Sequence, residues 1–465
     1  MKFANATLVS SMVLALVACG GGDDDGPSLN DLIEESAGSA GVEAYMLPES
    51  DDFANIPQDP NNPITAEKVA LGQMLYHETA IATAGVSDRV DTWSCASCHH
   101  AAAGFKSGIP QGIAEGGEGF GFTGESRVLV DGFAIDAEDP ALVPDIQPFT
   151  SPAVLNTAYQ EVMLWNGQFG NQANGVINSG LTDLVLATPG TPKQKNELGF
   201  GGLEIQAVAG TGVHRLKTDT DSVLQTNADY IAMFDAAFPN GPGDFPGETN
   251  ETTVAAGLAM ATYERTILAN QAPFQRYLRG ESDAMNAQEI RGAKLFFGDA
   301  GCADCHRGPG LSSEVGALED EVFMAIGFAD FDLTDDQIHS TPNNTETLGR
   351  GGFTGEEADN YKFKIPQLYN LADTDIFGHG ASFRSIRDVI AYKNAAVPQK
   401  IIPGSQLDPR FVPLGLSEEE IDDLTVFLET ALYDPDLNRY VPTALPTTNC
   451  FPVNDAEAQE DLGCD

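Results

Sequence analysis

Two short segments of the chain combine a pair of thiols with an adjacent imidazole. They are Cys95-Ala96-Ser97-Cys98-His99 and Cys302-Ala303-Asp304-Cys305-His306. The Cys-x-x-Cys-His spacing is typical of c-type haem attachment, in which both thiols bond to the haem vinyl groups and the histidine ligates the iron. A zinc ribbon needs cysteine pairs that converge, whereas about 200 residues separate these two pairs. The sequence therefore predicts two covalently bound haem c groups, with His99 and His306 as iron ligands.

The segments that lead into the two motifs resemble one another. Residues 65–76 and 286–297 each begin with a helix-capping residue and carry apolar side chains at helical spacing. Two further helices are expected, one over residues 252–268 and one after the capping box that starts at Ser417. Strand-like alternation is scarce. We expect a mainly α fold of two cytochrome c-like haem domains with long loops, formed by tandem duplication.

The order of segments predicts export and a lipid anchor. Residues 1–18 read as a lipoprotein signal peptide, because their apolar run is too short to span a bilayer and ends at Cys19 in a lipobox pattern. Residues 19–60, rich in Gly, Asp, Glu, Ser and Pro, are expected to be a flexible acidic tether. The protein is expected on the periplasmic side of a bacterial membrane, most simply the outer membrane. Export also fits the haem prediction, because haem c is attached outside the cytoplasm.

The rest of the chain divides into three parts. We expect an N-terminal haem domain over residues 61–282, a C-terminal haem domain over 283–404, and a C-terminal helix and tail over 405–465 that packs back on both. The remaining cysteines, Cys450 and Cys464, are candidates for a disulfide that closes this tail in an oxidising compartment.

The chain is strongly acidic, with 24 Lys and Arg against 69 Asp and Glu, a formal net charge of −45. Nucleic acid is therefore excluded as an expected partner. Such a surface attracts a basic electron-donor protein at low salt. The alternative is a heavily hydrated surface suited to a saline habitat, which the even spread of the acidic residues favours.

Several ordered motifs between residues 60 and 440 resemble those of one family. They are Trp93-Ser94-Cys95-Ala96-Ser97-Cys98-His99, Ser151-Pro152-Ala153-Val154-Leu155-Asn156, Leu164-Trp165-Asn166-Gly167, Tyr263-Glu264-Arg265-Thr266, Arg291-Gly292-Ala293-Lys294-Leu295-Phe296-Phe297 and Phe363-Lys364-Ile365-Pro366-Gln367-Leu368-Tyr369-Asn370. In this series the chain resembles the bacterial di-haem cytochrome c peroxidase superfamily, which includes the MauG-like enzymes that oxidise proteins.

The resemblance implies roles for particular residues. In that family the N-terminal haem binds peroxide, the C-terminal haem stores or relays electrons, and a tryptophan between them mediates transfer; Trp165 holds its motif position. Glu204 matches the distal carboxylate that helps to break the O–O bond, as a general acid or base, and Gln206 is expected to line the same pocket. The alternatives are a core aromatic for Trp165 and an ordinary carboxylate for Glu204.

The chain departs from the standard peroxidases at the distal iron ligands. No histidine occurs between His100 and His214, which predicts an open, five-coordinate first haem, as in MauG-like enzymes. The last methionine is Met324, so the distal methionine of the second haem is absent. Tyr392 or Lys393 takes its place: helical register favours Lys393, family precedent favours Tyr392, and only one can reach the iron.

Calcium is a candidate additional cofactor, at an inter-domain site where the family has an Asn. Thr150 stands at that position here, and Thr374 matches a residue that donates its carbonyl.

Three functions remain open. The first is a di-haem peroxidase that reduces hydrogen peroxide with electrons from a small redox protein, a cytochrome c or a cupredoxin. The second is a MauG-like enzyme that oxidises residues of a partner protein, and the third is a non-enzymatic di-haem electron carrier. A homodimer is compatible with all three functions.

Overall fold

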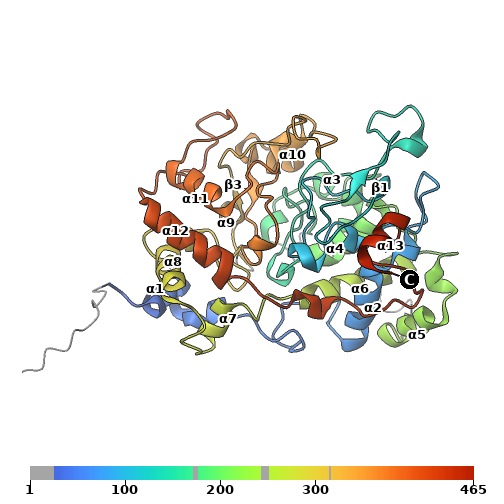
Figure 1. The fold of residues 1–465 in the computed structure, drawn as a ribbon, viewed down its shortest axis with the longest axis horizontal. Coiled ribbons are helices and arrows are strands. Elements are labelled where there is room, and N and C mark those ends of the chain that lie inside the picture. The colour runs from blue at the N-terminus through green and yellow to red at the C-terminus, as the bar shows by residue number, and fades with distance from the viewer. Residues whose placement is uncertain (1–25, 171–175, 242–250, 314–315, 465) are drawn as a thin grey trace, which may run out of the picture.

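The computed structural model describes residues 26–170, 176–241, 251–313 and 316–464, and Figure 1 shows their arrangement. Helices connected by long loops dominate the fold. The α-helices are α1 Leu29–Ala37, α2 Ala66–His77, α3 Asp183–Leu186, α4 Gly202–Val213, α5 Ala228–Ala237, α6 Glu251–Thr266, α7 Pro273–Leu278, α8 Ala287–Phe297, α9 Glu319–Val322, α10 Arg350–Thr354, α11 Ile386–Ala395, α12 Glu418–Val426 and α13 Ala456–Leu462. The described sheet is limited to two antiparallel pairs, β1 Gly117–Glu118 with β2 Val128–Leu129 and β3 Phe323–Met324 with β4 Phe363–Lys364.

The four helices expected from the sequence are confirmed, and caps explain where three of them begin. The Thr65 side chain accepts the N–H of the third helical residue of α2, and Asn286 and Ser417 form capping boxes at α8 and α12. Each cap satisfies backbone donors that the first helical turn leaves unpaired. These starts depend on neighbouring residues alone, which is why the sequence predicts them.

Each of the two helices that precede the motifs packs closely against a later helix. A methyl group at Gly72 in α2 would lie 2.0 Å from the Ala259 carbonyl oxygen of α6. In the same way, a methyl group at Gly292 in α8 would lie 2.1 Å from the Asp423 carbonyl oxygen of α12. Only glycine permits such an approach of two helix backbones. The α2–α6 and α8–α12 pairs lie in different halves of the molecule (Figure 1).

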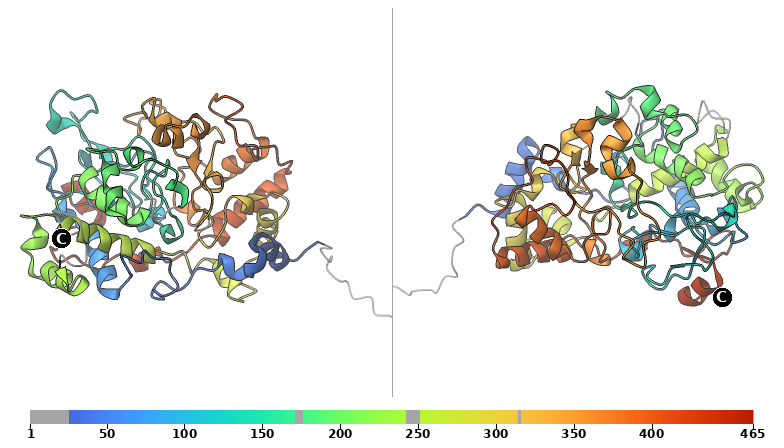
Figure 2. Two further views of the ribbon diagram at one scale, coloured as in Figure 1. Left: turned by 180° about the vertical axis from the view of Figure 1, so that it is seen from behind. Right: turned by 90° about the horizontal axis from the view of Figure 1, so that it is seen from above.

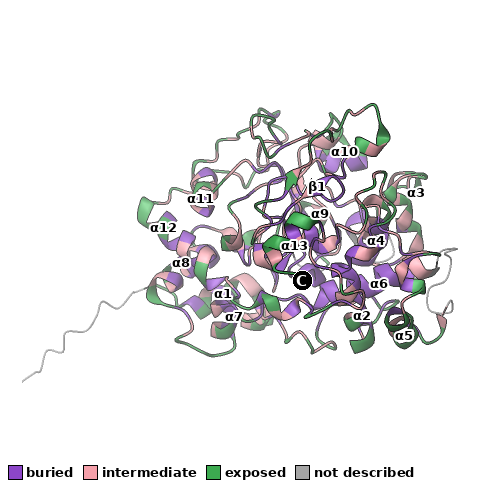
Figure 3. Cartoon of the chain, turned by 45° about the vertical axis from the view of Figure 1, so that its right-hand side comes forward, coloured by how far each residue is buried: buried purple, intermediate pink, exposed green. Residues whose placement is uncertain are grey.

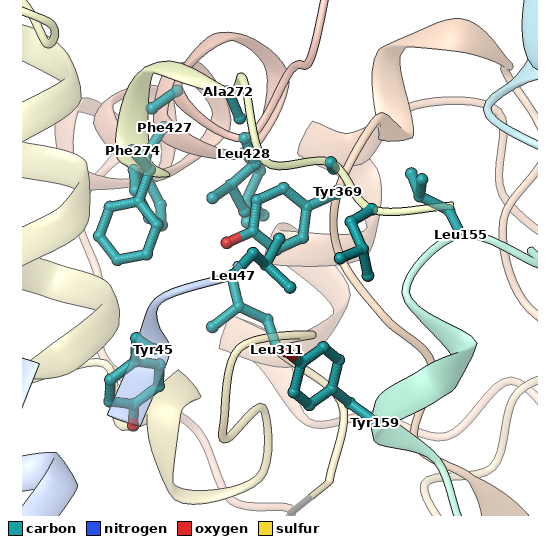
Figure 4. Packing of buried hydrophobic residues seen from close by; sticks show 14 of the residues in the cluster. Tyr45, Leu47, Leu155, Tyr159, Ala272, Phe274, Leu311, Tyr369, Phe427 and Leu428 are labelled. Atoms are coloured by element: carbon teal, nitrogen blue, oxygen red, sulfur yellow. The ribbon is translucent and has the colours of Figure 1, made fainter. Parts of the chain in front are cut away.

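The core continues between the two halves. Buried side chains from both meet in one cluster that includes Leu155, Tyr159, Leu311, Tyr369 and Phe427. Figure 4 shows Phe427 next to Phe274, at the far end of this cluster from Leu155. A second cluster lies among α2, α4 and α6. Figure 3 shows α6 buried along most of its length, whereas α5 and α12 expose their outer faces. The halves therefore share apolar packing as well as loop contacts.

The expectation of a flexible tether over residues 19–60 is wrong from Leu29 onward. Leu29 and Ile33, one helical turn apart in α1, are buried, and Tyr45 packs edge-on against Phe297 with ring centroids 5.0 Å apart. A few apolar residues at helical spacing are enough to dock a segment whose average composition is polar. The predicted signal peptide and Cys19 lie outside the described residues. Among those that are described, no helix is long and apolar enough to cross a bilayer.

The C-terminal tail runs from α12 in one half to α13 in the other (Figure 2). The expected disulfide between Cys450 and Cys464 is confirmed. Ahead of α13, the Pro452 carbonyl accepts hydrogen bonds from Ser94 and Ser97, both over 2.9 Å. The tail therefore holds the first Cys-x-x-Cys-His segment from outside.

Candidate haem sites

The first Cys-x-x-Cys-His segment forms a tight helical turn after α2. The backbone N–H groups of Cys98 and His99 both donate to the Cys95 carbonyl, over 3.3 and 3.2 Å. Tyr76, near the end of α2, donates its hydroxyl to the His99 carbonyl over 2.6 Å. The helix therefore fixes the position of the motif.

The second segment has the same local fold. The N–H groups of Cys305 and His306 donate to the Cys302 carbonyl, over 3.2 and 3.0 Å. The His306 Nδ1 atom lies 2.9 Å from the Leu311 carbonyl oxygen, which orients the ring. Both segments thus present two thiols and an imidazole from one turn.

These side chains fit the covalent attachment of haem c. All four cysteines are free and half-buried. Burial, together with a neighbouring cationic or imidazole side chain, lowers the pKa of His99 and of His306 to about 4, so both rings are neutral near pH 7 and hold a lone pair for a metal. The buried Nδ1 atom of His99 has no hydrogen-bond partner among the described residues. Each site could therefore supply two thioether bonds and one nitrogen ligand.

In the segment after each motif, a proline backbone acts on the imidazole of that motif. The Pro152 backbone acts to raise the pKa of His99, and the Pro366 backbone acts in the same way on His306, although burial outweighs both effects. Four residues after each proline comes an asparagine in the left-handed conformation, with φ of 60° at Asn156 and 54° at Asn370. The two segments thus repeat one backbone path beside the two histidines.

The same two segments contact each other through reciprocal backbone hydrogen bonds. The Thr150 N–H donates to the His379 carbonyl over 2.9 Å, and the Lys364 N–H donates to the Trp165 carbonyl over 2.8 Å. The Trp165 indole N–H donates to the Thr150 carbonyl over 2.8 Å, and its ring lies 6.1 Å from the His379 ring. The structure thus brings Trp165 to the contact between the segments that follow the two motifs.

Glu204 lies in the first turn of α4, in a buried ion pair. Its side chain is 0% exposed, and Arg265 donates to both carboxylate oxygens over 2.8 and 2.6 Å. Burial and the charge of Glu204 raise the pKa of the neighbouring Glu264 to about 8. A proton taken up by Glu204 would weaken this ion pair, so its acid–base role stays a prediction. Gln206, two residues further along α4, projects from a different side of the helix.

Tyr392 and Lys393 point in different directions from α11. The Tyr392 hydroxyl donates to the Ile326 carbonyl, and its ring lies 5.1 Å from that of Phe328. Lys393 instead interacts electrostatically with both thiols and with the imidazole of the second motif. Burial lowers the pKa of the Lys393 amine. Of the two candidate ligands, Lys393 is the one whose charge reaches the second motif.

One polar pair close to the first motif has no signal in the motifs of the sequence. His214, at the end of α4, places its Nδ1 atom 3.0 Å from Asp145 Oδ2, across 69 residues of chain. In the sequence, His214 stands out only as the end of a stretch without histidine. Its place ten residues after Glu204, at the end of the same helix, was the signal that could have singled it out.

In the part of the chain that the structure describes, no acidic cluster supports the predicted calcium site. No group of three or more His, Cys, Asp or Glu suited to a metal ion occurs in the described ranges. The Thr150 carbonyl accepts from the Trp165 indole, and its hydroxyl donates to the Gly378 carbonyl over 3.1 Å. Calcium binding therefore stays a prediction, as does the role of the Thr374 carbonyl as a calcium ligand.

Known proteins are similar to this chain over most of its length. A family model described as di-haem cytochrome c peroxidase matches residues 66–283. Cytochrome-c peroxidase IdrP1 of Denitromonas iodatirespirans is 27% identical over 414 residues, covering 85% of this chain and 89% of that protein. The methylamine utilization protein MauG of Methylorubrum extorquens is 27% identical over 398 residues, covering 84% of each chain.

One solved structure shares the fold. It is that of a MauG-like protein associated with microbial copper homeostasis, with a TM-score of 0.53 and 22% identity, covering 84% of this chain and 95% of that one. The repeated Cys-x-x-Cys-His turns agree with these matches: residues 66–283 match the di-haem cytochrome c peroxidase family, and the chain is similar over most of its length to a cytochrome-c peroxidase and to a MauG protein.

Proposed function

We propose that this protein is a di-haem c peroxidase that reduces hydrogen peroxide to two waters with two protons and two electrons from a small redox protein. The observation that carries the proposal is the pair of matching Cys-x-x-Cys-His turns whose following segments meet through Trp165 and His379. When bound, the haem iron supplies the site for peroxide and the store of electrons. The chain itself holds and orients the two groups and connects them.

We further propose that the two halves are tandem copies of one haem domain, residues 61–282 and 283–404. The glycine-mediated helix crossings at Gly72 and Gly292 support this, because each lies in the helix that leads into a motif. The reciprocal hydrogen bonds of Thr150 and Lys364 support it as well, since both residues stand two positions before the proline whose backbone acts on a histidine. A duplicated unit whose copies face each other produces such paired contacts.

For the second haem we propose Lys393 as the distal ligand in place of Tyr392. The Tyr392 hydroxyl already has the Ile326 carbonyl as its partner, and the ring is held among aromatic side chains. The Lys393 amine interacts with the thiols and the imidazole that would surround the iron. An amine and an imidazole would close the iron on both faces, as an electron-storing site requires.

Export and lipid anchoring at Cys19 belong to the same proposal. The lipobox pattern and the Cys450–Cys464 disulfide support them, because disulfides persist in oxidising compartments. The net charge of −45 supports a basic electron donor, such as a small cytochrome c, whose approach the acidic surface would accelerate at low salt.

The test is steady-state peroxide reduction by the haem-loaded protein with a reduced small cytochrome c, together with EPR of each haem during a peroxide titration. We expect turnover, one open high-spin haem and one closed low-spin haem. Failure of peroxide to change either haem spectrum would refute any peroxidase and leave an electron carrier. A stable two-electron-oxidised state without turnover would instead favour the MauG-like function, which the absence of a methionine after Met324 already makes the second candidate.

A further inference from the structure

A histidine–carboxylate pair lies close to the first Cys-x-x-Cys-His segment, outside the residues assigned so far. His214 follows the last turn of α4, and its Nδ1 atom lies 3.0 Å from Asp145 Oδ2. Asp145 is nearly buried, with a side chain 5% exposed, whereas His214 keeps 34% of its side chain exposed. The carboxylate is therefore a fixed anchor, and the imidazole is the accessible member of the pair.

Backbone contacts tie this pair to the first motif from two sides. The Trp93 indole N–H, two residues before Cys95, donates to the His214 carbonyl over 2.8 Å. The segment after the motif passes so close to Cys98 that a methyl group at Gly112 would lie 2.8 Å from its sulfur. Two residues later the Ala114 N–H donates to the Asp145 carbonyl over 2.9 Å. The pair therefore belongs to the wall around the first thiols.

The electrostatic effects of the His214–Asp145 pair agree with a position close to the first motif. The His214 ring contributes to the lowered pKa of His99, and the Asp145 charge contributes to the raised pKa of Cys98, with burial as the main cause in both cases. Burial also opposes a charge on His214 itself, but the Asp145 carboxylate outweighs it and raises the pKa of the ring. The pair acts on the same groups that would hold the first haem.

The free edge of the imidazole distinguishes His214 from Glu204. Asp145 engages Nδ1, while Nε2 has no hydrogen-bond partner among the described residues. A carboxylate that holds Nδ1 fixes the ring and its tautomer, which leaves Nε2 to donate or accept one proton. Both oxygens of Glu204, in contrast, are held by Arg265.

We propose that His214, oriented by Asp145, is the side chain that hydrogen-bonds small ligands at the first haem and transfers the proton during peroxide cleavage. Nε2 takes a proton from one peroxide oxygen and returns it to the other, which leaves as water when the O–O bond breaks. The remaining oxygen is reduced to a second water by the two electrons of the donor and two protons from solvent. This inference rests on the proposed peroxidase function. Asp145 is a positioning residue.

The test uses the haem-loaded full chain and cyanide as a probe of the open haem. We expect His214→Leu to weaken cyanide binding by about 10- to 100-fold, because bound cyanide loses a hydrogen-bond donor. The C–O stretching frequency of the reduced, CO-bound first haem should rise in the same variant. His214→Gln, which keeps an N–H donor, should recover part of both effects, and Asp145→Asn should lie between. His339→Gln, a histidine in another loop, is the matched control and should match the wild type.

Peroxide cleavage in a single turnover provides the second readout. His214→Leu should slow it by about 100-fold or more, the usual contribution of a positioned acid–base group.

If the wild-type protein turns over peroxide and His214→Leu equals it in cleavage, cyanide affinity and C–O frequency, the inference is wrong and the peroxidase proposal stands. If Glu204→Gln produces the losses expected of His214→Leu, Glu204 is the acid–base group instead. If the resting first haem is low-spin and becomes high-spin in His214→Leu, His214 is an iron ligand and the inference is also wrong. If the wild-type protein itself lacks peroxide turnover, the peroxidase proposal fails, whatever the cyanide result.

Discussion

The two Cys-x-x-Cys-His segments have the same backbone and different neighbours. Both form a turn whose last two N–H groups donate to the carbonyl of the first cysteine. Around the first stand the His214–Asp145 pair and the C-terminal tail. Around the second stands Lys393, whose charge affects the pKa of both of its thiols. Attachment is thus specified twice in the same way, and the surrounding side chains make the sites unequal.

This difference has a simple physical content. An iron site is open when the side chain at its second face is held away from the metal and contacts only a bound ligand, and closed when a donor of the chain reaches the metal. A histidine held by a carboxylate suits the first condition, and a desolvated amine suits the second. The inequality of the two haems can therefore be tested by changing these neighbours while both attachment motifs stay intact.

Lys393→Ala should break the difference most completely. Without the amine, the second haem is expected to lose its sixth ligand and change from low-spin to high-spin, while the first haem is unaffected. EPR and absorption spectroscopy of the resting protein measure the change. Tyr392→Phe is the matched control, because it removes a hydroxyl that donates to the Ile326 carbonyl and should leave both haems as they are. If Tyr392→Phe makes the second haem high-spin and Lys393→Ala does not, Tyr392 is the ligand.

Trp165→Phe should uncouple the two sites without changing either. The indole lies at the contact between the segments that follow the motifs, 6.1 Å from the His379 ring. We expect peroxide turnover to fall by about tenfold or more, a barrier increase of about 1.4 kcal/mol or more. Resting spectra and cyanide affinity should stay unchanged. Trp165→Tyr keeps an oxidisable ring and should retain more turnover; wild-type rates in both variants would make Trp165 a core aromatic.

The features that the sequence predicts are those specified by neighbouring residues. The haem motifs follow from five consecutive residues, and the starts of α2, α8 and α12 follow from caps at Thr65, Asn286 and Ser417. The disulfide follows from the two cysteines that the haem motifs and the lipobox leave over. None of these depends on the distant packing of the chain.

The features that it fails to predict arise from tertiary contacts. His214 and Asp145 are 69 residues apart, so their pairing has no local pattern. Glu204 matches the family by order, but the order does not reveal that Arg265 occupies both of its oxygens. Tyr392 and Lys393 differ by about 100° around one helix, and only the packing of α11 decides which one faces the second motif.

Arg265→Met tests whether Glu204 has a structural role. Its effect is expected at the first site alone. The change leaves a buried carboxylate without its cation, which is expected to lower the free energy of unfolding by about 3 to 5 kcal/mol. Guanidinium unfolding followed at the Soret band of each haem measures it. Glu204→Leu combined with Arg265→Met removes both charges and should recover part of the loss. A negligible loss of stability in Arg265→Met would show that the buried Glu204 carboxylate does not depend on its ion pair with Arg265.

Cys464→Ser should give a smaller loss of stability than Arg265→Met, and one confined to the tail and the first site. The disulfide closes a loop with a sequence separation of 14, so its loss is expected to cost about 2 to 3 kcal/mol of tail stability. The tail contacts the first motif, because the Pro452 carbonyl accepts from Ser94 and Ser97. Hydrogen exchange should therefore increase in residues 450–464 and around residue 95, while the segment around residue 302 keeps its protection. Cys450→Ser should behave identically, since either change breaks the same bond. Equal loosening of both motifs would mean that the tail stabilises the whole fold, and the two sites would then differ in their iron-facing side chains only.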